Sequence, residues 1–334
     1  MSTGTFVFDG DETPHNPFHN RYQILALSGG GYRGLFTAKV LEMLEQDSRP
    51  LRESFELITG TSIGSILAGA LSVGISAQTC VKGMIEHGPK IFPRGGPVRR
   101  TLRGTKKLFF RASYKTGPLE AAIRAILGDA ADQALSEIDQ ALVIPCVSHT
   151  RARLKLLRSK GLAGSDADDT SLLDAMLASA AAPTYFPARK IGTEVVIDGG
   201  LVANGPSLVG ISESVNWKQT PLDDIHVLAV GTASPSIARK SGKAGSPGVL
   251  GWMLSRQLFE TTMQAQETLA AEQCRMLIHD RFVELNVEPS AEQGRVIGLD
   301  KANPMSTGTL LDLATSIGQS QIVARSRSRF IAGR

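Results

Sequence analysis

Cysteine is scarce in this sequence of 334 residues, which contains only Cys80, Cys146 and Cys274. An odd number of cysteines, with no C-x-x-C spacing and no neighbouring histidine pair, argues against a disulfide framework and against a zinc site. We therefore expect reduced thiols, a cytoplasmic location and no bound metal.

A targeting signal and a membrane span are also missing. The first 20 residues contain acidic residues and two prolines but no apolar segment of the kind found in secretory signals. Residues 57–81 carry no charge, yet four glycines interrupt them. Because a spanning helix needs about 20 predominantly apolar residues, we expect this stretch to be buried core.

Acidic residues are absent from residues 90–115, which carry nine Lys and Arg residues interleaved with aromatic and aliphatic ones, although the net charge of the chain is only +4. A run of one charge sign is usually a solvated loop. The interleaving also fits a surface that meets anionic lipid headgroups or a phosphate-bearing ligand, and both interpretations stay open. Without a recognition-helix pattern or an RNP-like signature, no nucleic-acid polymer is expected as a partner.

The most informative stretch is Gly60-Thr61-Ser62-Ile63-Gly64, which lies between a β-prone segment, Phe55–Thr59, and a run of small, helix-compatible residues. This G-x-S-x-G pattern is typical of a nucleophile elbow, in which glycines on both sides let a strand and a helix approach closely around an exposed serine. The helix N-terminus also favours negative charge near the serine. A strand-to-helix turn with a capping serine would show the same residues.

A second stretch, Ser28-Gly29-Gly30-Gly31-Tyr32-Arg33-Gly34, separates a predicted strand at residues 23–27 from a predicted helix at 32–45. It satisfies the dinucleotide-binding fingerprint, so a Rossmann-type oxidoreductase that uses the Gly29–Gly34 loop is an alternative. Glu56, however, precedes the second apolar run, whereas the ribose-binding acid should follow it. The other interpretation is an anion cradle, in which the backbone amides of Gly29, Gly30 and Gly31 face an oxyanion and Arg33 adds positive charge.

The third stretch is a β-branched run, Val195–Ile197, followed by Asp198-Gly199-Gly200. An Asp-Gly turn is frequent and needs no function. In an α/β sheet, however, ligands bind beyond the carboxyl ends of the strands, where all three stretches are expected. A serine, a carboxylate and a ring of amides together are the groups that catalyse acyl transfer.

Taken in this order, the three stretches resemble those of the patatin-like phospholipases. The run Ala178–Pro187, ahead of the aspartate, resembles that family as well, so the resemblance covers residues 22–232. More narrowly, residues 22–35 and 198–204 are similar to the bacterial anti-phage effectors that a cyclic dinucleotide activates.

The resemblance implies a three-layer α/β/α fold with a mostly parallel central sheet. It implies one domain over residues 1–334, with a core at 22–232 and a C-terminal extension of helices and a strand at 233–334 that packs on the core. The expected activity is hydrolysis of membrane phospholipid esters at the inner membrane, without a cofactor and with Ser62 as nucleophile. A cyclic dinucleotide such as cyclic GMP-AMP is the expected activator, and a homo-oligomer is compatible with the resemblance.

The resemblance also implies a Ser62–Asp198 dyad instead of a triad. Of the six histidines, only His226 and His279 follow Asp198, as a triad histidine does in α/β-hydrolases. His226 lies within an apolar, strand-like run and His279 just before another such run. We therefore interpret both histidines as structural.

Hydrophobic periodicity and turn residues predict the remaining elements. We expect an acidic surface loop at residues 162–170 and a mobile Gly/Ser/Lys-rich segment at 239–251. The predicted helices span residues 76–87, 117–127, 172–182, 252–276 and 309–331, and the predicted strands span residues 142–149, 154–158, 225–230 and 281–287.

Overall fold

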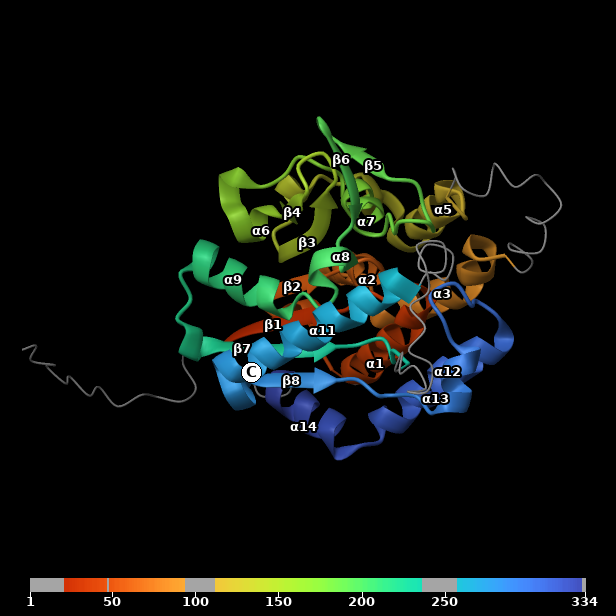
Figure 1. The fold of residues 1–334 in the computed structure, drawn as a ribbon. Helices are drawn as coiled ribbons and strands as arrows, with labels where there is room; N and C mark the ends of the chain where they lie inside the picture. The colour runs from red at the N-terminus through yellow and green to blue at the C-terminus, as the bar shows by residue number, and fades with distance from the viewer. Residues whose placement is uncertain (1–20, 47, 94–111, 236–256, 332–334) are drawn as a thin grey trace, which may run out of the picture.

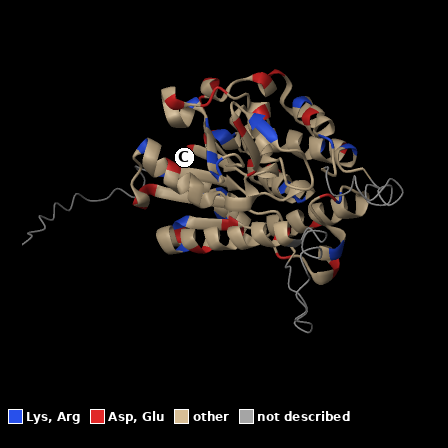
Figure 2. Cartoon of the chain, turned by 45° about the horizontal axis from the view of Figure 1, so that its top comes forward, with Lys and Arg blue, Asp and Glu red and all other residues tan. Residues whose placement is uncertain are grey.

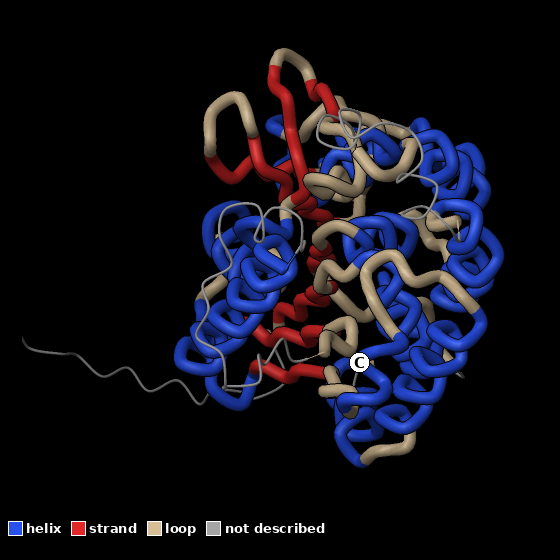
Figure 3. Tube along the Cα trace, turned by 45° about the vertical axis from the view of Figure 1, so that its right-hand side comes forward, coloured by secondary structure: helices blue, strands red, loops and turns tan. Residues whose placement is uncertain are grey.

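The fold consists of one β-sheet with helices on both faces, as the side view in Figure 3 shows. The computed structural model describes residues 21–46, 48–93, 112–235 and 257–331. The basic segment predicted at 90–115 and the mobile segment predicted at 239–251 therefore lie largely or wholly outside the described residues.

The sheet has eight strands among the described residues, in the order β5-β6-β3-β2-β1-β7-β8, with β4 paired to β3. Pairing is parallel from β3 through β2, β1 and β7 to β8, and antiparallel between β3 and β4, β3 and β6, and β5 and β6. The expected α/β fold with a mostly parallel sheet is confirmed. The strands are β1 (Tyr22–Leu27), β2 (Leu57–Gly60), β3 (Ala141–Ser148), β4 (Arg153–Arg158), β5 (Arg189–Ile191), β6 (Glu194–Asp198), β7 (Ile225–Val230) and β8 (Phe282–Leu285).

Helices α9 and α11 cover one face of the sheet, and most of the other helices cover the opposite face (Figure 1). The described α-helices are α1 (Gly34–Glu45), α2 (Ile63–Ser72), α3 (Ala77–Ile91), α5 (Thr116–Leu127), α6 (Lys160–Ala163), α7 (Leu172–Ser179), α8 (Gly200–Ala203), α9 (Ser207–Lys218), α11 (Gln257–Ile278), α12 (Ala291–Val296), α13 (Pro304–Gly318) and α14 (Gln321–Phe330).

The buried apolar residues form two cores, one on each face of the sheet, and alternate residues of a central strand belong to different cores. In β1, Leu25 and Leu27 pack in the larger core, against α1, α2 and α3, whereas Ile24 and Ala26 pack in the smaller one, against α9 and α11. Successive side chains of a strand point to opposite faces, so a strand buried on both faces is apolar throughout. This is why the central strands were recognisable as short continuous apolar runs.

Two predicted elements differ from the structure. The closing helix predicted at 309–331 is two helices, α13 and α14, because Ser320 has an extended backbone (φ −77°, ψ 153°) and caps a new helix. The acidic loop predicted at 162–170 contains the end of α6 and a 3₁₀ turn at Gly164–Asp166. Helix α9, for which we made no prediction, has weak amphipathic character.

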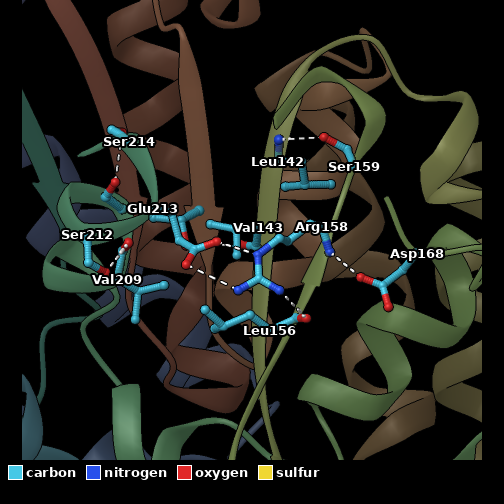
Figure 4. Close-up of polar contacts among 12 residues, drawn as sticks. Leu142, Val143, Leu156, Arg158, Ser159, Asp168, Val209, Ser212, Glu213 and Ser214 are labelled. Atoms are coloured by element: carbon cyan, nitrogen blue, oxygen red, sulfur yellow. Dashed lines mark hydrogen bonds and ion pairs between the residues drawn. The ribbon is translucent and has the colours of Figure 1, made fainter. Parts of the chain in front are cut away.

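Within that acidic segment, Asp168 has a structural role (Figure 4). Its Oδ2 accepts a hydrogen bond from the Arg158 amide at 2.8 Å, at the end of β4. The Arg158 guanidinium forms a two-point ion pair with Glu213 of α9, with Nη2 to Oε1 at 3.2 Å. This bidentate pair ties the β3–β4 hairpin to the helix layer on the smaller core.

Basic and acidic residues are interspersed along the chain in the view of Figure 2. Within the described ranges, no helix is both long enough and apolar enough to cross a bilayer.

Candidate active site

The geometry of the sheet brings Ser62 and Asp198 together, although not in the way the sequence predicts. Strand β6 runs antiparallel to β3, so Asp198 does not lie at the same edge by strand direction alone. Instead, β3 continues past its last pair with β2, Thr59–Val143, and Asp198 pairs with Cys146 in this extension. Strand β6 therefore runs back along this extension of β3 and ends with Asp198 beside the turn that follows β2.

Ser62 lies at the start of α2 with φ 56° and ψ −122°, a conformation that costs a non-glycine residue energy. Its amide donates to Ser179 Oγ at 3.0 Å, and that hydroxyl donates to the Pro145 carbonyl at 2.6 Å. The strained turn is thus held by a side chain from α7. No local pattern assigned this role to Ser179, because only the fold brings α7 to this turn.

The glycines of the G-x-S-x-G pattern are required by close backbone contacts. A Cβ atom on Gly60 would lie 2.0 Å from the Gly64 carbonyl oxygen, and one on Gly64 would lie 2.2 Å from the Leu27 carbonyl oxygen. Both distances are far below van der Waals contact. The turn can therefore bring Ser62 close to the end of β1 only with glycine at both positions.

Asp198 is fully buried at the end of β6. Its Oδ1 accepts the Gly200 amide at 2.7 Å, whereas Oδ2 has no partner of regular hydrogen-bond geometry among the described residues. Burial raises the pKa of Asp198 to about 7, and hydrogen bonds from the Gly200 amide and the Ser62 side chain oppose this shift only in part. A carboxyl group with this pKa can accept and release a proton near neutral pH.

The glycine loop contributes two free amides to the site. The Gly29 amide donates to the Asn204 carbonyl at 3.0 Å, so it is not available for an oxyanion and our expectation for Gly29 is corrected. The amides of Gly30 and Gly31 make no hydrogen bond to another described residue. Gly31 has φ 56°, and a Cβ there would lie 2.3 Å from the Leu299 carbonyl oxygen, so only glycine fits.

Arg33 is buried behind the loop and is not among the described residues that line the cavity around Ser62. Burial lowers the pKa of its guanidinium, while the charges of Glu260 and Glu267 on α11 raise it. Its Nε has no partner among the described residues. Arg33 therefore contributes charge from behind the loop rather than a contact inside the cavity.

Ser62 and Asp198 line one cavity whose walls are almost entirely apolar. Its walls come from α2, α3, α5 and α11 and from the segment before β5, so it extends from the serine into the larger core. Its volume is about 80 Å³, so in this structure it admits part of a hydrocarbon chain rather than a whole long one. Its apolar lining includes Ile63, Ile66, Met84, Phe92, Leu119, Ile123, Tyr185, Phe186, Phe259 and Met263.

Neither histidine considered for a triad lies near this cavity. His226 pairs with Gln23 near the amino end of β1, whereas Ser62 lies beyond the carboxyl ends of β1 and β2. Burial and the neighbouring Arg329 lower the pKa of His226 to about 4. His279 lies in the turn before β8, also at the amino edge. The histidine that does line the cavity is His87 of α3, which our chain-order argument did not consider.

The position of Glu56 does not support the dinucleotide-binding alternative. Its Oε2 accepts the Gln23 amide at 2.6 Å at the start of β1, whereas the glycine loop follows the other end of that strand. A ribose held by the loop would therefore be out of reach of this acid. As for metals, the described residues contain no group of three or more His, Cys, Asp or Glu side chains placed to hold an ion.

Asn204 and Glu267 are two further buried polar residues beside the site that the sequence did not reveal. Asn204 Nδ2 donates to Glu267 Oε2 at 3.0 Å and to the Gly29 carbonyl at 3.4 Å. Glu267 belongs to α11, which is far from the glycine loop in the sequence. No local pattern marks such a contact.

Several known proteins are similar to this chain in sequence. A family model described as "Patatin-like phospholipase" matches residues 25–209. A relative from Pseudomonas aeruginosa is 31% identical, over 89% of this chain and 88% of its own. Relatives from Escherichia coli and Vibrio cholerae are each 30% identical, over 87% of this chain and 86% and 88% of their own. All three bear the name "cGAMP-activated phospholipase".

Proposed function

The chain belongs to the patatin-like phospholipase family, and from that premise we propose that it hydrolyses membrane phospholipid esters with Ser62 as nucleophile and Asp198 as general base. The observation that carries the proposal is that Ser62, which has a strained backbone, and Asp198, which has a raised pKa, line the same apolar cavity. Nucleophilic catalysis needs a positioned hydroxyl and a base near it.

In the proposed reaction, the Ser62 hydroxyl attacks the ester carbonyl carbon while Asp198 accepts its proton. The amides of Gly30 and Gly31 stabilise the negative oxygen of the tetrahedral intermediate. The C–O bond to the glycerol oxygen then breaks, and that oxygen takes the proton from Asp198 as the lysophospholipid leaves. Water, activated by Asp198, attacks the acyl-enzyme and releases the fatty acid.

The walls of the cavity support a fatty acyl chain as the part of the substrate that enters it. Burying a methylene group in apolar surroundings contributes about 0.8 kcal/mol, so each methylene of the acyl chain that enters the cavity adds to binding without a polar contact. The headgroup would then stay at the mouth of the cavity, where the membrane surface meets the enzyme.

The raised pKa of Asp198 predicts how hydrolysis depends on pH. Only the carboxylate can accept the serine proton, so kcat/KM for a soluble ester should rise with pH and level off above about pH 7. Below that value it should fall roughly tenfold per pH unit. Initial rates between pH 4.5 and 9 measure the profile. A rate that stayed level from pH 9 down to about pH 5, as an aspartate of ordinary pKa would give, would contradict the burial of the base.

We also propose that a cyclic dinucleotide such as cyclic GMP-AMP activates the enzyme, which would act on the inner membrane from the cytoplasm as one domain of residues 1–334. Support comes from the three bacterial relatives, whose shared name includes activation by cGAMP. Hydrolysis of phospholipid vesicles should therefore increase severalfold or more with one member of a panel of cyclic dinucleotides, measured as released fatty acid. Equal rates with and without every nucleotide would refute activation while leaving the hydrolase assignment intact.

A further inference from the structure

A second cavity lies along β8, the edge strand of the sheet, between α11 and α14. Its volume is about 750 Å³, within the range of roughly 300–1,000 Å³ that is usual for small-molecule sites. It is distinct from the apolar cavity at Ser62, and the mechanism above makes no use of it. The lining residues that matter here are Ser234, Glu267, Arg275, Phe282, Arg325 and Arg329.

Three arginines and three glutamates line this cavity, and the arginines are the groups that suit the phosphates of a ligand. Arg325 and Arg329 are four residues apart on α14 and so lie on one face of that helix, opposite Arg275 of α11. Guanidinium groups bind phosphate oxygens in pairs of hydrogen bonds. Arg275 forms a close ion pair with Glu284. Arg329 donates to the Asp280 carbonyl at 2.9 Å and contacts His226 Nδ1 at 3.2 Å, but the Asp280 carboxylate is 3.8 Å away and exposed. Arg325 donates to Gln321 at 3.3 Å and has no ion pair among the described residues, so Arg325, with Arg329 beside it, is assigned to phosphate.

Glu267 provides a polar contact at the inner end of this cavity. It is 92% buried, since its exposed fraction is 8%, and its Oε1 has no hydrogen bond of regular geometry among the described residues, although the Ser28 side chain and the Arg33 charge act on the carboxylate. A buried oxygen without a partner is costly, so it marks a place where a ligand group can bind. The N–H groups of a nucleobase edge are donors of the required kind.

Two series of hydrogen bonds connect this cavity to the active site, and both end on the Gly29 carbonyl oxygen. In the first, Asn204 Nδ2 donates to Glu267 at 3.0 Å and to Gly29 at 3.4 Å. In the second, the hydroxyls of Ser234 and Thr232 are 3.2 Å apart, and Thr232 Oγ1 donates to Gly29 at 3.4 Å. Glu267 and Ser234 both line the second cavity.

The Gly29 carbonyl and the Gly30 N–H belong to one planar peptide unit. Any change that turns this carbonyl must therefore turn the Gly30 amide, one of the two proposed oxyanion donors. An oxyanion donor is effective only when it points at the place where charge develops. The hydrogen bonds that start in the second cavity therefore affect the orientation of the Gly30 amide, a proposed oxyanion donor.

We propose that the cavity between α11, β8 and α14 binds the activating cyclic dinucleotide, and that Glu267 and Ser234 transmit its binding to the Gly29–Gly30 peptide. The inference rests on the proposed function, because it assumes that such a nucleotide is the activator. Its two phosphodiester groups would contact Arg325 and Arg329, and a base edge would contact Glu267.

Isothermal titration of full-length protein with cyclic GMP-AMP and with other cyclic dinucleotides tests the site. For the nucleotide that binds, Arg325→Ala and Arg329→Ala should each weaken affinity by roughly tenfold or more, as expected for a lost charge-assisted contact. Arg327→Ala is the matched control. It removes the same charge from the same helix, but its guanidinium contacts Ser48 and does not line the cavity. The Arg327→Ala variant should bind the nucleotide as tightly as the wild type does.

The link to the active site has its own test. Thr232→Val keeps the shape of the side chain but removes the hydroxyl, so the nucleotide should bind with unchanged affinity while its activation of vesicle hydrolysis falls. Normal activation in this variant would overturn the link.

Unchanged affinity in both the Arg325 and Arg329 variants would place the site elsewhere and leave the proposed function untouched. No binding of any cyclic dinucleotide to the wild type would overturn the site and the proposed activator together. Basal hydrolysis that depends on Ser62 would then still support the phospholipase assignment.

Discussion

Ser62→Ala is expected to abolish phospholipid hydrolysis, with a loss of at least roughly 10³-fold in kcat. The reason is that the Ser62 hydroxyl forms the acyl-enzyme bond, and no other described hydroxyl at the N-terminus of α2 lines the cavity. Released fatty acid from vesicles, and labelling of the protein by a fluorophosphonate probe, measure the two consequences. Both signals should disappear, while the midpoint of thermal unfolding stays that of the wild type.

Ser72→Ala is the matched control for this variant. Ser72 is buried on the same helix, and its hydroxyl donates only to the Gly69 carbonyl, at 2.8 Å, away from the cavity. The same atom is removed, yet hydrolysis and labelling should remain. If Ser62→Ala kept full activity, the nucleophile would have to be another residue and the proposed mechanism would fail.

Asp198→Asn should lower kcat by roughly 10²–10⁴-fold, the usual contribution of a general base. Asparagine has the same shape, and its Oδ1 can still accept the Gly200 amide, so the fold should persist. What is lost is the group that accepts the serine proton. Rates measured at pH 8, where the wild-type carboxylate is ionised, give the full difference.

Two further measurements decide whether Asp198 is the base. The double variant Ser62→Ala/Asp198→Asn should be no less active than Ser62→Ala alone, because residues that act as one catalytic unit are not additive. His87 also lines the cavity, so His87→Ala is the informative comparison. An active Asp198→Asn enzyme together with an inactive His87→Ala enzyme would transfer the role of base to His87.

Local patterns in the sequence predicted most of the central strands and the three loops of the site. The pattern around Ser62 was recognisable because its glycines are required by contacts within one turn and the strand beside it. The prediction of one closing helix was wrong although the sequence contains signals for the break. Gly318 ends α13 and Ser320 is the N-cap residue of α14, and these are residue types that commonly end and begin helices.

The sequence by itself determined the fold class, the family and the residue types of the site, because each is encoded in short stretches whose geometry is local. Only the tertiary structure decided how Asp198 reaches Ser62, since that depends on β3 extending beyond β2 and on β6 returning antiparallel to it. The same holds for the raised pKa of Asp198 and for the contacts of Glu267. Burial and long-range pairing are properties of the assembled sheet, and no single segment of the chain carries them.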